Sequence, residues 1–301
     1  MKKNLVMAMG SGYNENELAP FFNSLKQSGY TGDICFITRE QDAHAVSNFS
    51  KVANIKIHLF REQKPMKKNR VRKIGKFIDS TCTRYPVLRK LSVNFREKYA
   101  IKNSCAHLRR HFFFRDILGS YAKEYQNVMM TDVRDVVFQR DPFDFEIQPG
   151  SIYYFLEAEH TRIQDCEKNS WWIREMLGEE ALGRLGPNQI SCGGTIIGCP
   201  QVMLMHFKIT TESIAKNLRC CNRAGIDQAP HHLIIWDRLV PNVHVIPNRA
   251  GIILTMQTTK REHWSITDDG LIMVDGDKVP NTVHQYDRYP DATKAILARY
   301  T

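Results

Sequence analysis

The stretch MMTDVRDVVFQRDPF, from Met129 to Phe143, holds two apolar runs separated by a pair of aspartates. Its first apolar run ends at Thr131 and is followed by Asp132 and Asp135, before a second apolar run leads to Asp-Pro-Phe. Such a run predicts a buried strand. Two carboxylates at its end are either part of a solvated turn, where aspartate is common, or ligands of Mg²⁺ or Mn²⁺, which are bound through carboxylate oxygens.

The first sixty residues predict the kind of sheet that this strand joins. Apolar strand patterns at 5–9, 33–38 and 55–60 alternate with helical patterns at 15–27 and 41–49. A β-α-β-α-β order favours a parallel sheet with helices packed on it. Ligands bind such sheets at the carboxyl ends of the strands. The predicted fold class is therefore α/β, with a Rossmann-like, mixed but mainly parallel sheet flanked by helices.

The rest of the chain continues the mixture of helices and strands. We see no repeat, no low-complexity segment and no clear linker, and we predict a single domain over 1–301, with a basic helical insertion at 61–102 and a C-terminal segment, 280–301, that closes the site. Further helices are predicted at 103–119, 171–177, 179–185, 200–218, 226–239 and 291–299, and further strands at 127–131, 151–157, 190–198, 243–246, 252–256 and 271–274.

Composition excludes several other classes of protein. The chain is 43% hydrophobic and 25% charged, which is ordinary for a globular protein, and no apolar run approaches the roughly 20 residues of a membrane-spanning helix. The apolar stretch at 5–9 is too short for a signal peptide. None of the eight cysteines forms a C-x-x-C pair, which argues against a zinc ribbon. We expect unpaired core cysteines and a cytoplasmic, reducing compartment.

The net charge of +10 is concentrated between residues 61 and 115. A basic balance suits nucleic acid, an anionic membrane surface or phosphorylated ligands, and a solvated surface is the simpler alternative. Apolar residues at helical spacing in this segment predict one or two amphipathic basic helices that could lie on a membrane face. These apolar residues are Ile74, Phe77, Ile78, Val87, Leu88, Leu91, Val93 and Phe95.

The opening stretch, taken with its surroundings, resembles the nucleotide-sugar glycosyltransferases of the GT-A fold, especially retaining families of the glycogenin and galactosyltransferase type. Aligned on DVVFQRDPF, Asp135 takes the place of the last aspartate of their Asp-x-Asp pair, which chelates the metal. The first aspartate would fall on Val133, and the sequence has Asp132 instead. Asp132 is expected to reach the metal or the ribose, or to orient the loop, and Asp141 to belong to the following turn. The resemblance implies Mn²⁺ or Mg²⁺ and a nucleotide-diphosphate sugar, foremost a UDP-sugar.

Two further stretches match these families in the same order along the chain. CAHLRRHFFFRDIL implies an arginine that faces the nucleotide, with Arg110 fitting best and Arg109 or Arg115 as alternatives. SCGGTIIG implies that the backbone at Gly193 and Gly194 lies against the donor and the acceptor. Glycine inside a strand marks such a close approach or a β-bulge, and both explanations remain open.

The last two matching stretches supply the remaining candidates. IDQAPHHLIIW implies that Asp227 and Gln228 project into the site, although Asp227 could instead cap the helix. TVHQYDRYP implies His284 as the last metal ligand and Arg288 as a partner of the diphosphate. Glu157, Asp227 and Gln228 are candidates for contacts on the reacting face. If the reaction inverts the anomeric configuration of the sugar, Asp227 or Glu157 would act as general base on the acceptor hydroxyl.

The resemblance implies a hexosyltransferase-like, metal-dependent enzyme that transfers sugar with retention to a glycan or glycolipid in cell-surface polysaccharide synthesis. We expect peripheral contact with an anionic membrane at its cytosolic face through 61–102, and no nucleic acid. One alternative is a nucleotidyltransferase acting on sugar phosphates, although GSGYNENE offers only Gly10 and Gly12 as a phosphate loop. Another is a non-catalytic basic module that binds nucleic acid or anionic membrane, which explains the charge but not the acidic pair.

Overall fold

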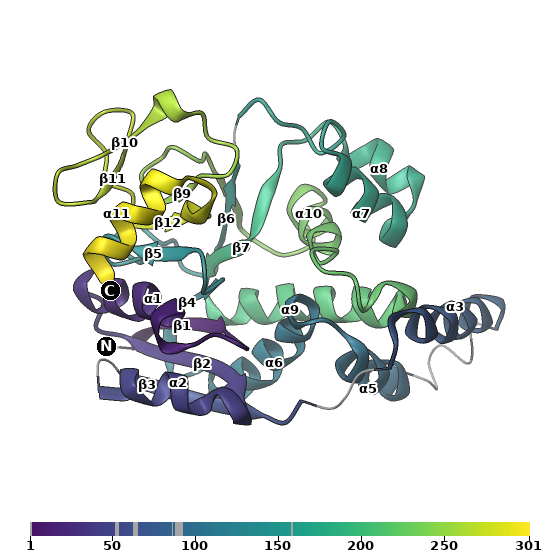
Figure 1. Cartoon of the computed structure of the whole chain (residues 1–301). Helices are drawn as coiled ribbons and strands as arrows, with labels where there is room; N and C mark the ends of the chain where they lie inside the picture. The colour runs from purple at the N-terminus through teal and green to yellow at the C-terminus, as the bar shows by residue number, and fades with distance from the viewer. Residues whose placement is uncertain (1, 52–53, 63–65, 86, 88–92, 158) are drawn as a thin grey trace.

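The computed structural model describes residues 2–51, 54–62, 66–85, 87, 93–157 and 159–301. At its centre lies a seven-stranded sheet in the order β3-β2-β1-β4-β7-β6-β8 (Figure 1). Its strands are β1 (Lys3–Met9), β2 (Asp33–Arg39), β3 (Asn54–Phe60), β4 (Tyr125–Thr131), β6 (Ile152–Leu156), β7 (Ser191–Gly198) and β8 (Val243–Ile246). β7 runs antiparallel to both of its neighbours, and the other neighbouring pairs are parallel. The predicted mixed, mainly parallel, Rossmann-like sheet is confirmed.

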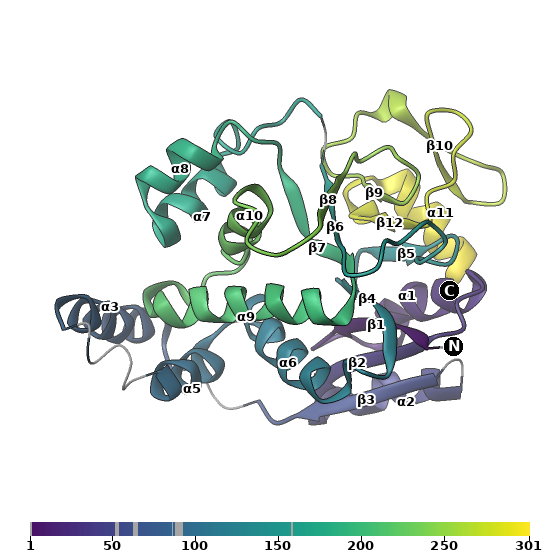
Figure 2. The same cartoon turned by 180° about the vertical axis from the view of Figure 1, so that it is seen from behind.

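Helices flank this sheet on both sides (Figures 1 and 2). The α-helices are α1 (Glu15–Gln27), α2 (Ala43–Ser47), α3 (Lys68–Arg84), α5 (Val93–Asn103), α6 (Ala106–Tyr121), α7 (Glu167–Leu177), α8 (Glu179–Leu185), α9 (Pro200–Lys216), α10 (Gln228–Trp236) and α11 (Pro290–Tyr300). Short 3₁₀ helices are η1 (Glu40–Asp42), η2 (Asn48–Lys51), η3 (Leu218–Cys220), η4 (Arg261–His263) and η5 (Tyr286–Arg288).

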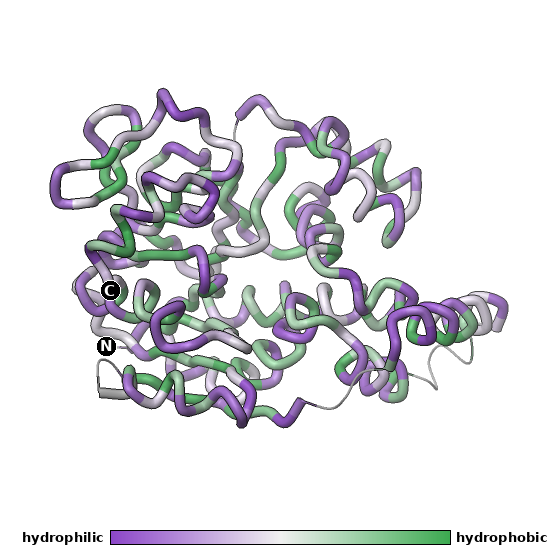
Figure 3. Tube along the Cα trace, in the orientation of Figure 1, coloured by the Kyte–Doolittle hydropathy of each residue, from purple (hydrophilic) through white to green (hydrophobic). Residues whose placement is uncertain are grey.

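The alternation of side chains along β1 shows how the two faces are covered. Val6 and Ala8 pack in the same apolar cluster as α1, whereas Leu5 and Met7 pack with α6 and α9 on the opposite face. This alternation follows the two-residue period of a strand. Both faces of the sheet are therefore apolar and buried, and the central strands stand out as hydrophobic in Figure 3.

A third apolar cluster lies beside the sheet and joins α7, α8 and η3 to the basic segment. In that segment α3 packs against η3 and α5 packs against α9, and both α3 and α5 lie at one end of the molecule (Figure 1). The expected basic helical insertion at 61–102 thus contains two described helices. Leu88 and Leu91, which we expected on its apolar face, lie outside the described residues.

Two small sheets complete the fold beside the central one. β5 (Val136–Phe138), β12 (Thr282–His284) and β9 (Ile253–Thr255) form a three-stranded sheet, and β10 (Trp264–Ile266) pairs with β11 (Ile272–Val274). The strands β5, β10 and β12 were not predicted from the sequence. β12 and α11 make up most of the C-terminal segment, and α11 packs against α1. In the part of the chain that is described, no helix is long and apolar enough to span a membrane.

Candidate functional site

A cavity of about 400 Å³ opens where β1 and β4 end. The chain leaves β1 toward β2 and β3, and later returns to β4 on the other side of β1. A crevice forms at such a reversal of strand order, outside the carboxyl ends of the strands, and ligands commonly bind there. Met9, Ser11 and Tyr13 line the cavity from the loop after β1, and Asp132 and Asp135 line it from the loop after β4.

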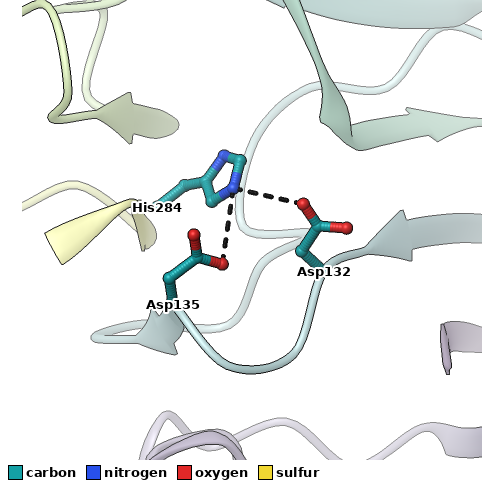
Figure 4. A group of neighbouring side chains, drawn as sticks. All are labelled: Asp132, Asp135 and His284. Carbon is teal, nitrogen blue, oxygen red and sulfur yellow. Dashed lines mark ion pairs between the residues drawn. The ribbon is translucent and has the colours of Figure 1, made fainter. Parts of the chain in front are cut away.

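Three side chains converge in this cavity in a pattern that fits a metal ion (Figure 4). One ligand atom each from Asp132, Asp135 and His284 lies within 4.8 Å of the others. His284 Nε2 is 3.5 Å from Asp132 Oδ2 and 3.7 Å from Asp135 Oδ1. This nitrogen is buried and has no hydrogen-bond partner among the described residues. Since buried polar atoms are normally satisfied, a divalent cation between the three side chains would supply its missing partner.

Strand pairing brings His284 to this place from near the other end of the chain. β12 runs antiparallel to β5, so that His284 lies opposite Val136, the residue after Asp135. The backbone N–H of Gln285 donates to the backbone oxygen of Asp135 at 2.7 Å. On its other edge, β12 pairs in parallel with β9, so that both edges of β12 are hydrogen-bonded. The imidazole position is therefore set by backbone hydrogen bonds.

Cys192 contacts the other side of this imidazole and was not predicted as a site residue. Its Sγ lies 3.6 Å from His284 Nδ1. Burial raises the pKa of the Cys192 thiol, so that it stays protonated at neutral pH. A sulfur atom at this distance can accept the Nδ1–H and leave the Nε2 lone pair for a metal ion, as hydrogen bonds around metal ligands commonly do. Cysteine in an apolar strand is common in protein cores, and no sequence signal distinguished this one.

The charged side chains of the metal cluster shift one another's pKa values. Burial lowers the pKa of His284. The sulfur of Cys192, which can accept the Nδ1–H, and the carboxylates of Asp132 and Asp135 outweigh burial and raise this pKa well above its ordinary value. Burial raises the pKa of Asp132, whereas Arg110 and His284 more than offset this and hold it well below its usual range. Burial also raises the pKa of Asp135, despite the neighbouring His284. In the absence of a metal ion, a protonated imidazole offsets part of the negative charge of the two carboxylates.

Arg110 links this cluster to the rest of the cavity. Its guanidinium donates to Asp132 and, at 3.4 Å, to the backbone oxygen of Gly193. Arg109 instead donates to two backbone carbonyls beyond the cavity, and Arg115 pairs with an acidic side chain of α5. Of the three arginines proposed from the sequence, Arg110 is therefore the one that lines the cavity.

Asp227 is held by the same guanidinium and by a second buried side chain. Its Oδ2 lies 3.2 Å from Arg110 Nη2 and 3.1 Å from His111 Nε2. Although burial raises the pKa of Asp227, these two partners lower it to about 2. Asp227 occupies the N-cap position of α10, but its side chain makes no capping hydrogen bond, so the capping alternative is wrong. The role of His111, a buried histidine on an apolar helix face, could not be read from the sequence.

The glycine pair in β7 allows the cavity side chains to approach the backbone. A Cβ atom at Gly193 would lie 2.5 Å from Gln228 Oε1, and one at Gly194 would lie 2.5 Å from Asp132 Oδ2 and from His284 Cε1. Gln228 Oε1 accepts the Gly193 N–H at 2.8 Å. The register between β6 and β7 is also irregular at this point. The two explanations left open by the sequence, a bulge and a close approach, therefore describe one feature.

The remaining candidates differ in where they lie. Arg288 lines the cavity, with its Nη2 3.9 Å from Asp135 Oδ2. Glu157 follows β6, is buried and does not line the cavity, and burial raises its pKa to about 7. Asp141 Oδ1 accepts the Phe143 N–H at 2.9 Å, which confirms its place in a turn. Cavity residues that were not predicted include Ser11, Tyr13, His107, Arg134, Trp172 and Gln285.

Residues far apart in the sequence thus meet in one cavity. Glu157 does not line this cavity, although it lies near enough to His284 for the imidazole to lower its pKa. No family model matches the chain, and no curated protein matches it. What the site does must therefore be argued from its geometry. The candidates that line the cavity or the metal cluster are Arg110, Asp132, Asp135, Gly193, Gly194, Asp227, Gln228, His284 and Arg288.

We predict that Gly194→Ala weakens Mn²⁺ binding by at least about tenfold, because the new methyl group would displace Asp132 and His284. Isothermal titration calorimetry measures the affinity, and circular dichroism checks the fold. Gly183→Ala is the matched control, since Gly183 is exposed in α8 and a Cβ there meets nothing within 4 Å. Equal Mn²⁺ affinities of the two variants would contradict the cluster as a metal site.

Mn²⁺ affinity is predicted to rise with pH through the neutral range. The raised pKa of His284 means that a metal ion must displace its proton, so the apparent affinity rises by up to about tenfold per pH unit and levels off above that pKa. Calorimetry in buffers of different ionisation enthalpy would detect the released proton. An affinity that stays constant across this range, with no proton release, is the contrary outcome.

Asp227→Asn is expected to lower the free energy of unfolding of the metal-free protein by about 1–3 kcal/mol, because Arg110 and His111 lose a charged acceptor in a buried setting. Asp237→Asn, at the other end of α10, removes only a surface pair with Arg184 and should cost less than about 1 kcal/mol. Urea unfolding measures both values. A similar cost for the two variants would show that the Asp227 contacts contribute little.

Proposed function

We propose that this chain is a metal-dependent glycosyltransferase of GT-A-like fold that moves a sugar from a nucleotide-diphosphate sugar to a glycan or glycolipid acceptor. The observation that carries the proposal is the convergence of Asp132, Asp135 and His284 in a cavity at the strand-order reversal of a mainly parallel sheet. Gly194, Asp227 and other cavity residues come from the segments that motivated the resemblance. Cell-surface polysaccharide synthesis in the cytoplasm is the setting that we propose.

Two carboxylates and one imidazole would hold the metal ion, and the imidazole nitrogen favours Mn²⁺ over Mg²⁺, which is bound mainly through oxygen. When bound, the ion supplies positive charge to the diphosphate leaving group. Arg134 and Arg288 line the same cavity and are partly exposed, so their guanidinium groups can also bind diphosphate oxygens. Positive charge would thus surround the bond that breaks.

The cavity is suited to a ligand of the size of a nucleotide sugar. Its volume of about 400 Å³ lies within the usual range for small-molecule sites. Ser11 Oγ lines it, is buried and has no hydrogen-bond partner among the described residues. The rings of Tyr13 and Trp172 offer apolar surface nearby. A donor with a planar base and several hydroxyl groups fits this lining, and we propose a UDP-sugar.

The cavity carboxylates favour retention over inversion. An inverting transfer needs a general base that takes the proton of the acceptor hydroxyl. Among the described residues that line the cavity, the carboxylates are Asp132, Asp135 and Asp227. The first two would hold the metal ion, and the third has a pKa of about 2 because it is paired with His111 and Arg110. None of these three carboxylates is suited to act as a base near neutral pH. Glu157 has a pKa of about 7, which would suit a base, but it does not line the cavity. We propose that the sugar keeps its anomeric configuration.

The proposal is tested by measuring hydrolysis and transfer from a panel of nucleotide sugars with and without Mn²⁺. We predict turnover of at least one donor that requires the metal ion, and a loss of roughly 100-fold or more for Asp135→Ala. Asp144→Ala, which removes only an exposed carboxylate paired with Arg140, is the control and should keep full activity.

Three results would each require a different conclusion. An absence of metal-dependent binding or turnover with every donor would exclude the proposed reaction. Pyrophosphate release from a nucleoside triphosphate and a sugar 1-phosphate would identify a nucleotidyltransferase instead. Full activity of Asp135→Ala would show that the metal ion is held elsewhere.

A further inference from the structure

One face of α3 packs closely against the rest of the protein, mainly against η3. Val71, Gly75, Asp79 and Cys82 are the buried positions of this helix, and their spacing places them on one side of it. A Cβ at Gly75 would lie 2.7 Å from backbone atoms of η3. The backbones of α3 and η3 are therefore in contact at Gly75. This contact fixes which residues of α3 point outward.

The opposite side of α3, which we call the outer face, consists of exposed residues at the same helical spacing. Its central side chain, Phe77, is 73% exposed, although burying a phenylalanine would be favourable. Ile78, which we expected to share an apolar face with Phe77, packs against the third apolar cluster instead. The outer face comprises Arg70, Lys73, Phe77, Ser80 and Arg84.

The positive charge around Phe77 is not compensated. Asp79, the acidic residue of α3, is turned inward and lies 2.8 Å from Arg96 Nη2. It also accepts the backbone N–H groups of Leu218 and Arg219. No ion pair with any described residue involves the exposed cations of α3. These cations are Lys68, Arg70, Arg72, Lys73, Lys76 and Arg84.

This combination matches a bilayer surface better than a single-stranded nucleic acid. Single-stranded nucleic acids are bound in basic grooves with aromatic platforms, whereas the outer face is the convex side of a helix. In a bilayer, an aromatic ring enters the boundary of the acyl chains while lysine and arginine remain at the anionic headgroups. Val93 and Phe95 of α5 are also exposed, and α5 lies at the same end of the molecule as α3 (Figure 1).

We propose that the outer face of α3 docks the protein on an anionic lipid bilayer, with Phe77 inserted and Lys73, Arg70 and Arg84 at the headgroups. The argument uses no residue of the cavity, so it holds independently of the proposed sugar transfer.

Co-sedimentation of the full chain with vesicles tests the proposal. We predict binding to vesicles that contain phosphatidylglycerol, little binding to phosphatidylcholine alone, and loss of binding at high salt because the charges are exposed. Arg70→Glu combined with Lys73→Glu should weaken binding by at least about tenfold. The matched control, Lys26→Glu with Lys294→Glu, makes the same change in net charge at exposed positions of α1 and α11 and should bind like the unchanged protein.

Phe77 is tested separately, because charge alone would not require insertion. Phe77→Ser should weaken vesicle binding severalfold, and Phe77→Trp should show added fluorescence that brominated lipids quench, relative to the unchanged protein. Circular dichroism and thermal melting exclude misfolding. Equal weakening by the control pair, an unquenched signal from the introduced indole, or tighter binding to single-stranded RNA than to anionic vesicles would each overturn the bilayer assignment.

Discussion

The pairing of β12 with β5 is the interaction on which the candidate site depends. β5 begins directly after Asp135, and its antiparallel register with β12 sets His284 opposite Val136. The hydrogen bond from the Gln285 N–H to the Asp135 carbonyl closes the end of this ladder. Both the loop that carries the carboxylates and the strand that carries the imidazole are thus held by backbone bonds. A metal ion bound there would find ligands already in place, which lowers the entropic cost of binding.

The site also depends on Arg110, because its positive charge stabilises two neighbouring carboxylates, those of Asp132 and Asp227. Asp132 and Asp227 would repel each other in a partly dehydrated cavity, and the guanidinium bonds to both. Removing one partner from such a buried pair costs far more than the pair contributes. At Asp135, burial and the neighbouring Asp132 outweigh His284 and Arg288 and raise the pKa of the carboxyl. The surplus of negative charge therefore lies at the metal cluster, where a divalent cation would balance it.

How far the sequence predicts this arrangement depends on the range of the interactions. The helix over Glu15–Gln27 and the strand patterns of the first sixty residues were confirmed because periodicity is a local signal. β5 and β12 are three residues each, too short for a period, and their pairing joins distant segments. The metal ligands were proposed through resemblance in motif order, whereas Cys192 and His111 act through tertiary contacts. Phe77 was predicted on an apolar helix face, but only packing shows that it points outward.

Two partly exposed arginines of the cavity, Arg134 and Arg288, differ from Arg110 in a way that bears on donor binding. Arg134 and Arg288 both pair with Asp287, at 3.1 and 2.7 Å, and all three are partly exposed. Surface pairs of this kind contribute little to stability, so a diphosphate could replace Asp287 as their partner at small cost. The Arg110 pairs are buried, and breaking them would leave charge without a partner. The cavity thus combines two kinds of arginine. Arg110 is held in buried pairs and orients Asp132 beside the metal cluster, whereas Arg134 and Arg288 can exchange Asp287 for an incoming anion.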